Sequence, residues 1–379
     1  MQKSFKMIQR HLSRQVSEAL FKGKVILVFG PRQVGKTTLV RGLLQERSEP
    51  ALQLNADDPT VRRLLDAPNT EQLRQIIADY KIVFVDEAQQ ISEIGKTAKL
   101  FVDTFGDVQL ILSGSSSFDL ANATQEPLTG RKRTFFMHPV SWMEWQDFVG
   151  FVKAEQDLEN RLVFGMYPDV LNNPTQQEVI LREIADSYLY KDVLLYGNLK
   201  KPDEIRSLLQ ALAFQVGNEV SYNELGQTIG LDPKTVERYI NILEKAFIVF
   251  RLGSFSRNLR NEVRKGRKIY FYDNGIRNAV IGQLQPFSIR QDTGALWENF
   301  VICERQKRNT YKQQFVNSFF WRTTQQQEID YIEEHNGQLE GFEIKYSEKR
   351  KVKIPKPFIA NYNASVNIIN RGNFRDFIW

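Results

Sequence analysis

The sequence contains very few of the side chains that bind soft metals or form disulfides. Its 379 residues include one cysteine, Cys303, and three scattered histidines, His11, His138 and His335. A single thiol excludes an intrachain disulfide and a cysteine-cluster metal site, and scattered histidines argue against a zinc enzyme. A chain without disulfides is typical of a reducing compartment, so the sequence predicts a cytoplasmic protein.

Long apolar runs are also missing. No stretch approaches the roughly 18–20 consecutive apolar residues that a membrane-spanning helix needs. The start, MQKSFKMIQRHLSRQ, has no apolar signal core. The sequence therefore predicts no membrane association. Hydrophobic residues make up 42% of the chain and charged residues 25%, which is ordinary for a globular protein. The length permits about two to four domains.

Acidic residues are too few to balance the basic ones, and the net charge is +6. The excess is concentrated at 251–270, where seven basic residues accompany one acid, Glu262. Such a stretch is typical of contact with nucleic-acid phosphates, although a solvated loop can have the same composition. The residues predicted to contact DNA are Arg257, Arg260, Arg264, Lys265, Arg267 and Lys268.

The strongest motif is KVILVFGPRQVGKTTLV at 24–40. An apolar strand at 25–29 leads into GxxxxGK[ST], and a helix begins near Lys36. The glycines let the loop N–H groups face the phosphates, while Lys36 reaches the β- and γ-phosphates and Thr37 offers its hydroxyl to Mg²⁺. The residues predicted to bind ATP are Gly30, Pro31, Arg32, Gln33, Val34, Gly35, Lys36, Thr37 and Thr38.

Two further apolar strands end in polar residues that belong with this loop. KIVFVDEAQQI at 81–91 contains Asp86, which would hold Mg²⁺, and Glu87, which would orient the attacking water. VQLILSGSSS at 108–117 offers Ser113 and Ser115 as sensors of the γ-phosphate, or as helix caps. Because Glu87 is present, the sequence predicts hydrolysis rather than passive binding of nucleotide.

The order of these motifs, followed by LTGRKRTFFMHPVSWMEW at 128–145, resembles an AAA+ ATPase domain. The resemblance implies that Arg131 is an arginine finger acting on the ATP of a neighbouring subunit, with Arg133 as the fallback. A surface arginine at the start of a strand is the alternative interpretation. A finger that acts across an interface implies a homo-oligomer, for which a hexamer is the most plausible form.

Residues 203–250 differ in character from the ATPase part. The sequence predicts an amphipathic helix and then helix, turn, helix and strand, with Ser221 and Glu224 as a capping box and Pro233 at a first helical position. This pattern indicates a winged helix-turn-helix whose wing is the basic stretch. Residues 218–250 hold five acids and three bases, which favours contact with DNA backbone over base reading. A module that only packs against protein remains the alternative.

The C-terminal part carries three acids and a lysine in a suggestive order. A predicted helix holds Glu298, and a predicted hairpin at 328–346 places Asp330 on one strand and Glu343 and Lys345 on the other. This order resembles the PD-(D/E)XK nuclease core, with spacing similar to archaeal-type Holliday-junction resolvases. Asp330, Glu343 and Glu298 would bind Mg²⁺ or Mn²⁺, and Lys345 would act on the nucleophile. A solvated hairpin or an inactive scaffold are the alternatives.

The chain as a whole resembles a large prokaryotic family of AAA+ ATPases with a C-terminal DUF4143 region. The resemblance rests on GPRQVGKTTL, VDEAQ, SGSSS, LTGR, GMYPDV, SYLYKDVL and KIYFYDNGIRN, with one departure at Asn55, where an aspartate is commoner. The expected fold class is α/β, with four parts: a P-loop AAA+ core at 1–150, a helical lid packed on it at 151–202, a winged helix-turn-helix at 203–273, and a restriction-endonuclease-like PD-(D/E)XK domain at 274–379.

Together these expectations describe an ATP-driven, oligomeric DNA-processing motor with a Mg²⁺-dependent nuclease, acting on branched duplex DNA such as a Holliday junction. The alternative is a nucleotide-dependent switch whose nuclease-like domain only binds DNA or a protein partner. A transcriptional regulator would rest on the winged helix alone, and the acidic helix pair argues against it. ATP turnover that DNA stimulates would favour the motor over the switch.

Overall fold

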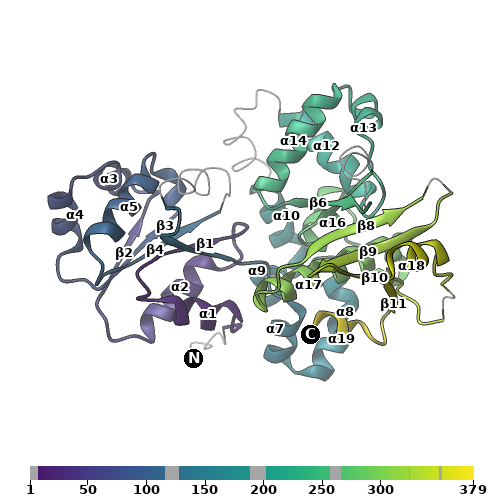
Figure 1. Cartoon of the computed structure of the whole chain (residues 1–379), viewed down its shortest axis with the longest axis horizontal. Coiled ribbons are helices and arrows are strands. Elements are labelled where there is room, and N and C mark those ends of the chain that lie inside the picture. Colours follow the sequence, from purple (N-terminus) through teal and green to yellow (C-terminus); the bar gives the residue numbers. More distant parts are fainter. Residues whose placement is uncertain (1–6, 116–127, 188–201, 257–265, 324, 350–351) are drawn as a thin grey trace. The chain divides into compact units, whose positions relative to one another are not determined.

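The chain divides into two compact units, each built on its own β-sheet (Figure 1). A computed structural model describes residues 7–115, 128–187, 202–256, 266–323, 325–349 and 352–379. The first unit comprises Met1–Val140 with Lys245–Phe247, and the second comprises Ser141–Glu244 with Ile248–Trp379. Within the described residues, no helix is both long and apolar enough to cross a membrane.

The first unit contains a parallel five-stranded sheet with the order β2-β3-β4-β1-β5. Its central strands are buried along their whole length, which explains why they read as continuous apolar runs rather than alternating ones. The parallel α/β architecture predicted for this part is confirmed. The strands are β1 (Val25–Phe29), β2 (Ala51–Asn55), β3 (Ile82–Asp86), β4 (Gln109–Gly114) and β5 (Lys132–Phe136).

Helices cover this sheet on two sides (Figure 1). Helix α1 packs with α2, and α4 packs with α5. The sequence fixes where several of them begin: Asp58 caps α3, and Asn69 forms a capping box with Gln72 at the start of α4. The helices are α1 (Leu12–Ala19), α2 (Lys36–Gln45), α3 (Pro59–Leu65), α4 (Thr70–Ile77) and α5 (Ile94–Thr104), with a short 3₁₀ turn, η1 (Ala88–Gln90).

The second unit contains a mixed six-stranded sheet with the order β11-β10-β9-β8-β6-β7. Strand β6 pairs antiparallel with β7 and parallel with β8, so the predicted wing strands belong to the same sheet as the predicted nuclease hairpin. The boundary predicted between 273 and 274 therefore separates strands of one sheet. The strands are β6 (Val249–Ser254), β7 (Arg267–Phe271), β8 (Asn317–Arg322), β9 (Glu328–His335), β10 (Gln338–Ile344) and β11 (Ser365–Ile369).

The helices of the second unit surround this sheet (Figure 1). The longest, α17, carries Glu298 and contacts β7 and β10. The helices are α7 (Trp142–Val149), α8 (Phe151–Phe164), α9 (Pro168–Asn172), α10 (Gln177–Ser187), α12 (Pro202–Phe214), α13 (Tyr222–Ile229), α14 (Pro233–Lys245), α16 (Asn274–Val280), α17 (Thr293–Tyr311), α18 (Lys356–Tyr362) and α19 (Phe374–Ile378), with a 3₁₀ turn, η3 (Phe287–Ile289).

The helical lid predicted at 151–202 is corrected over its described part. Helices α8 and α10 both pack against α16 inside the second unit, rather than forming a lid that belongs to the ATPase core. Side-chain amides of α16 hold the end of α8: Asn274 Nδ2 donates to the Leu162 carbonyl at 3.1 Å, and Asn278 Nδ2 donates to the Val163 carbonyl at 2.8 Å. These bonds satisfy carbonyls that a helix end leaves without an intrahelical partner.

Local predictions for the second unit agree well with its elements. Helix α13, a tight turn and α14 precede the β6–β7 pair, as the sequence predicted, and Ser221 caps α13. Strands β9 and β10 form the predicted hairpin, with Asn336 and Gly337 at positive φ of 51° and 77° in its two-residue turn. Asn-Gly suits this turn because both positions need a left-handed backbone.

Candidate nucleotide and nuclease sites

The predicted ATP-binding loop joins β1 to α2 at the carboxyl edge of the first sheet. Residues 30–35 form the loop, and Lys36, Thr37 and Thr38 open α2. Gly30 has no room for a side chain, because a Cβ there would lie 2.0 Å from the Met137 carbonyl oxygen. Gly35 adopts φ of 96°, which favours glycine. The glycines therefore shape a loop that turns sharply into the helix N-terminus.

The Lys36 side chain already points into this loop. Its ammonium donates to the Gly30 carbonyl at 2.8 Å and to the Pro31 carbonyl at 2.7 Å. The lysine therefore crosses the space that the loop encloses, where phosphate oxygens would replace carbonyls as its acceptors. This arrangement agrees with the predicted role of Lys36 at the β- and γ-phosphates.

Asp86, at the end of β3, joins a side chain of helix α2 to one of strand β4. Thr37 Oγ1 donates to Asp86 Oδ2 at 2.6 Å, and Ser113 Oγ donates to Asp86 Oδ1. Strand β4 lies between β1 and β3, so Ser113 at its end is placed between the loop and the acid. Thr37 and Asp86 supply oxygens of the kind that Mg²⁺ prefers, and both residues fit their predicted role in holding the ion.

Glu87 has an unusual backbone for its residue type. Its φ of 52° and ψ of 38° are left-handed, a conformation that costs energy for a residue with a side chain. Gln89 Nε2 donates to its carboxylate, and Ser115 Oγ donates to Glu87 Oε2 at 3.3 Å. Strained backbones cluster at functional sites. The structure therefore brings Glu87 and Ser115 together, while Ser113 faces Asp86 instead.

The predicted finger Arg131 pairs within its own unit. Its Nε donates to Asp103 Oδ1 at 2.6 Å, and the pair is partly exposed to solvent. An exposed pair of this kind contributes little to stability, so it does not commit the arginine to Asp103. Arg133, the fallback, lies on the exposed part of β5. The finger role of either arginine stays a prediction.

The second candidate site lies on the β9–β10 hairpin. Phe342 pairs with Tyr331, and Glu343 and Asp330 are the next residues along the two strands. The Lys345 ammonium contacts both acids, Asp330 Oδ2 at 2.6 Å and Glu343 Oε2 at 3.0 Å. The Ile344 amide also donates to Asp330 Oδ2 at 2.8 Å, which fixes that carboxylate. The structure therefore brings together the three hairpin residues that the sequence singled out.

Glu298 joins this region through a different lysine. The Tyr270 hydroxyl donates to Glu298 Oε1 at 2.7 Å, and Lys268 Nζ lies 3.5 Å from the same oxygen. Lys268 also forms an ion pair with Glu328, the first residue of β9. Lys268 and Tyr270 are two apart on β7, so they point to the same side of the strand. Both reach the acids from the strand predicted as part of a wing.

Burial and like charges shift the pKa values of these acids. Burial raises the pKa of Glu343 to about 7, and the Asp330 charge beside it acts in the same direction. Burial also raises the pKa of Glu298 to about 7, although the Lys268 charge opposes that shift. Burial disfavours the Lys345 ammonium, but the Asp330 carboxylate keeps its pKa above the ordinary value. Two acids that resist ionisation beside a lysine are typical of functional sites.

The hairpin pair suits a hard cation in its donor chemistry. The Lys345 ammonium marks a position within reach of oxygens from both Asp330 and Glu343, and Mg²⁺ is commonly held by one or two carboxylates together with substrate phosphates. In the described parts of the chain, no group of three or more His, Cys, Asp or Glu side chains is placed so that it could hold a metal ion. Asp330 and Glu343 could therefore hold a cation only if water or substrate supplied its remaining ligands.

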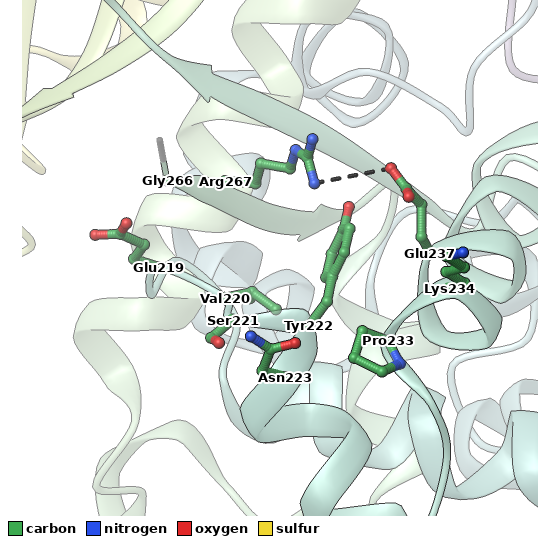
Figure 2. A pocket seen from close by; sticks show the side chains of 10 residues that line it. All are labelled: Glu219, Val220, Ser221, Tyr222, Asn223, Pro233, Lys234, Glu237, Gly266 and Arg267. Carbon is green, nitrogen blue, oxygen red and sulfur yellow. Dashed lines mark ion pairs between the residues drawn. The ribbon is translucent and has the colours of Figure 1, made fainter. Parts of the chain in front are cut away.

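Of the residues predicted to contact DNA, only Arg267 and Lys268 lie within the described parts of the chain. Arg257, Arg260, Arg264 and Lys265 lie outside the described residues. Arg267 is partly exposed and lines a pocket of about 400 Å³ at the starts of α13 and α14 (Figure 2). Its guanidinium lies 4.8 Å from the centre of the Tyr222 ring and pairs with Glu237 at 3.9 Å.

The prediction that Lys268 contacts DNA is wrong. Its side chain is only 2% exposed, and its ammonium is committed to Glu298 and Glu328. A phosphate on the surface cannot reach it without breaking these buried ion pairs. The local sequence could not reveal this, because Lys268 stands in a run of basic residues whose other members were expected to face solvent.

Two sets of contacts at the candidate sites were not found from the sequence. Arg10 Nη1 donates to the Val34 carbonyl of the phosphate loop at 2.7 Å, and its Nη2 donates to the His138 carbonyl at 2.6 Å. Lys268 with Tyr270 supports Glu298, as described above. No short motif marks either feature. The alternation of Lys268 and Tyr270 within an apolar strand was the only signal, and it was read as charge on a wing.

Family models match three successive parts of the chain. Residues 22–146 match the AAA domain family, residues 155–286 match the domain of unknown function DUF8612, and residues 293–376 match the domain of unknown function DUF4143. The chain therefore combines an AAA-type ATPase domain with a DUF4143 domain, as the motifs predicted. The AAA match supports ATPase activity with nucleotide and Mg²⁺.

Two relatives match more than two thirds of the chain. An uncharacterized protein of Mycobacterium tuberculosis is 27% identical over 341 residues, covering 89% of this chain and 74% of that protein. An uncharacterized protein of Haemophilus influenzae is 25% identical over 283 residues, covering 68% of this chain and 69% of that protein.

Two solved structures show a loose likeness. A RuvB mutant of Thermotoga maritima has a TM-score of 0.32 with 16% identity, covering 69% of this chain and 90% of that chain. The Pif1 helicase of Candida albicans has a TM-score of 0.27 with 14% identity, covering 41% of this chain and 44% of that chain. Scores this low carry no argument about function.

Proposed function

We propose that this chain is an ATP-hydrolysing, oligomeric DNA-processing enzyme with a divalent-cation-dependent nuclease site of the PD-(D/E)XK type in its second unit. The observation that carries the proposal is the contact of Lys345 with both Asp330 and Glu343 at the end of one hairpin. Two carboxylates and a lysine on adjoining strands form the smallest set that can hold a cation and act on a phosphodiester.

The ATP half of the proposal assigns roles to the loop and strand ends. Lys36 binds the phosphates, Thr37 and Asp86 hold Mg²⁺, and Glu87 orients the attacking water. Arg131 would leave its exposed pair with Asp103 and complete the site of a neighbouring subunit. A site completed in this way requires an oligomer, and we infer a hexamer as its form.

The nuclease half assigns complementary roles to the hairpin. A divalent cation held by Asp330 and Glu343 would stabilise the charge that develops on the scissile phosphate. The Lys345 ammonium, which is partly exposed, would turn from the carboxylates towards the attacking water or the phosphate. The Ile344 side chain between the two is 2% exposed and packs in the core, while its amide holds the Asp330 carboxylate.

The proposed substrate is branched DNA. The 13-residue step from Asp330 to Glu343 and the following Lys345 resemble the spacing in resolvases that cut four-way junctions. Arg267 beside its pocket at the starts of α13 and α14 offers a cation for backbone phosphate near the same sheet. A winged-helix module built from α13, α14, β6 and β7 would present it.

The test is cleavage of synthetic four-way, forked and linear duplexes with Mg²⁺ or Mn²⁺, with and without ATP. Wild-type protein is expected to cut the four-way junction, and Asp330→Ala and Lys345→Ala are expected to lose at least about a hundredfold of that activity. Lys312→Ala changes an exposed lysine at the end of α17 and should retain full cleavage. Cleavage that survives in both hairpin variants would contradict the proposal.

A second candidate is a nucleotide-dependent switch whose nuclease-like domain only binds DNA or protein. The ion pairs of Lys345 with Asp330 and Glu343 also favour this alternative, because the lysine balances the charge of both carboxylates without a metal ion. Wild-type protein that binds junctions but cuts none of the three substrates would support this alternative over the nuclease.

A further inference from the structure

We propose that the nuclease site takes a single divalent cation, because Lys268 is built into the position that a second cation would otherwise fill. This inference rests on the nuclease function proposed above. It makes Lys268 a positioning residue, and it removes Glu298 from the set of metal ligands that the sequence predicted.

The acids near the hairpin fall into two pairs, each with its own lysine. Asp330 and Glu343 share the Lys345 ammonium. Glu298 and Glu328 share the Lys268 ammonium, which is 3.5 Å from Glu298 Oε1 and also in contact with Glu328. Glu328 and Asp330 are two residues apart on β9, so each pair takes one acid from the same short stretch of strand. The two pairs are therefore adjacent halves of one cluster.

The two lysines differ in their freedom to leave. The Lys345 side chain is 23% exposed, whereas the Lys268 side chain is 2% exposed. Lys268 lies on the edge strand β7, and its ammonium is 5.4 Å from the centre of the Phe320 ring of β8. Lys345 can therefore turn into solvent when a cation enters, but Lys268 cannot do so without opening the packing between β7 and its neighbours.

Charge also disfavours a cation at the position of Lys268. A divalent cation between Glu298 and Glu328 would place its charge beside the buried Lys268 ammonium, which is costly.

Two side chains of β7 hold Glu298 in place. The Tyr270 hydroxyl donates to its Oε1 at 2.7 Å, and Lys268 approaches the same oxygen. Because two donors already bind Oε1, a cation at Glu298 would have to bind Oε2 with the Lys268 ammonium beside it. Lys268 and Tyr270 thus fix Glu298 as a support for the cluster, and β7 contributes to the nuclease site instead of to a wing surface.

The test counts Mn²⁺ ions bound to nucleotide-free, full-length protein by electron paramagnetic resonance of the free ion. Wild-type protein is expected to bind one Mn²⁺ per chain, and Asp330→Asn is expected to lose it. Two ions per chain, both lost on Asp330→Asn, would overturn this inference and leave the nuclease proposal intact. No bound ion would overturn the nuclease proposal and this inference with it.

Lys268→Ala provides the sharper arm of the experiment. Without the ammonium, Glu298 and Glu328 face an open position, so a second Mn²⁺ is expected to bind. Lys268→Arg keeps a cation there, and Lys312→Ala changes an exposed lysine, so both should stay at one ion. A folded Lys268→Ala protein that still binds one ion would overturn the assignment. If Lys268→Ala does not fold, Lys268→Gln is measured in its place. The number of Mn²⁺ ions bound by wild-type protein tests the inference whether or not either variant folds.

Discussion

Arg10 is a single residue that joins the phosphate loop to the segment after β5. It is 9% exposed, and its guanidinium donates to the carbonyls of Val34 and His138 at 2.7 and 2.6 Å. Replacing it with methionine should loosen the phosphate loop, because hydrogen bonds from a charged donor contribute about 2 kcal/mol each. We expect Arg10→Met to weaken ATP binding by roughly tenfold, measured with a fluorescent ATP analogue.

Arg14 provides the matched control for this prediction. It lies four residues further along, its side chain is 87% exposed, and it pairs with its helical neighbour Glu18. Arg14→Met should bind ATP as wild type does, since an exposed pair within one helix contributes little. Equal affinity of Arg10→Met and wild type would show that the loop keeps its shape without the arginine.

Single residues also show what a sequence can and cannot reveal. Lys345 was identifiable because its partners lie in the same hairpin, where strand alternation and an Asn-Gly turn set the geometry. Lys268 was misread because its burial depends on the pairing of β6 with β8, whose residues are about 65 positions apart in the chain. Local pattern decides which face a side chain takes, whereas only long-range pairing decides what covers that face.

Strand β7 is held at the edge of its sheet by one side chain of α17. Asn299 Oδ1 accepts from the Phe271 amide at 2.8 Å, and its Nδ2 donates to the Phe271 carbonyl at 3.0 Å. Asn299→Leu would leave that buried amide without a partner. We expect it to lower the free energy of unfolding of the second unit by about 3 kcal/mol.

Tryptophan fluorescence during urea unfolding measures this effect selectively. All five tryptophans, Trp142, Trp145, Trp297, Trp321 and Trp379, lie in the second unit. Asn317→Leu, at the exposed first residue of β8, is the control, and it should change stability by no more than about 0.5 kcal/mol. Equal midpoints for the two variants would show that β7 is held by its ladder with β6 alone.

Elements were predicted more reliably than their packing. The capping residues of α13 and the proline that opens α14 fixed those helices from local chemistry. The placement of α8 depended on amides of α16, more than a hundred residues away, and sequence spacing carries no sign of that contact. The motif YDNG owes its form to the same contact, since Asp273 accepts from the Met166 amide at 2.7 Å and caps α16.

At the scale of the whole molecule, the question is whether ATP hydrolysis in the first unit responds to DNA. A motor must couple hydrolysis to its track, whereas a switch needs only to bind nucleotide and change state. Glu87 has a left-handed backbone, and Gln89 and Ser115 donate hydrogen bonds to its carboxylate, so the carboxylate must be released before it can orient water. An acid held in this way suits ATP hydrolysis that becomes fast only when a partner such as DNA binds.

We expect duplex or four-way DNA to raise ATP turnover of wild-type protein by about tenfold or more, since each factor of ten needs only about 1.4 kcal/mol of barrier. Glu87→Gln should bind ATP normally but show no turnover with or without DNA, while Lys36→Ala should lose binding as well. Steady-state phosphate release checks all three proteins. Turnover that is slow and identical with and without DNA would assign the first unit to a switch, and the hairpin site would then act without a motor.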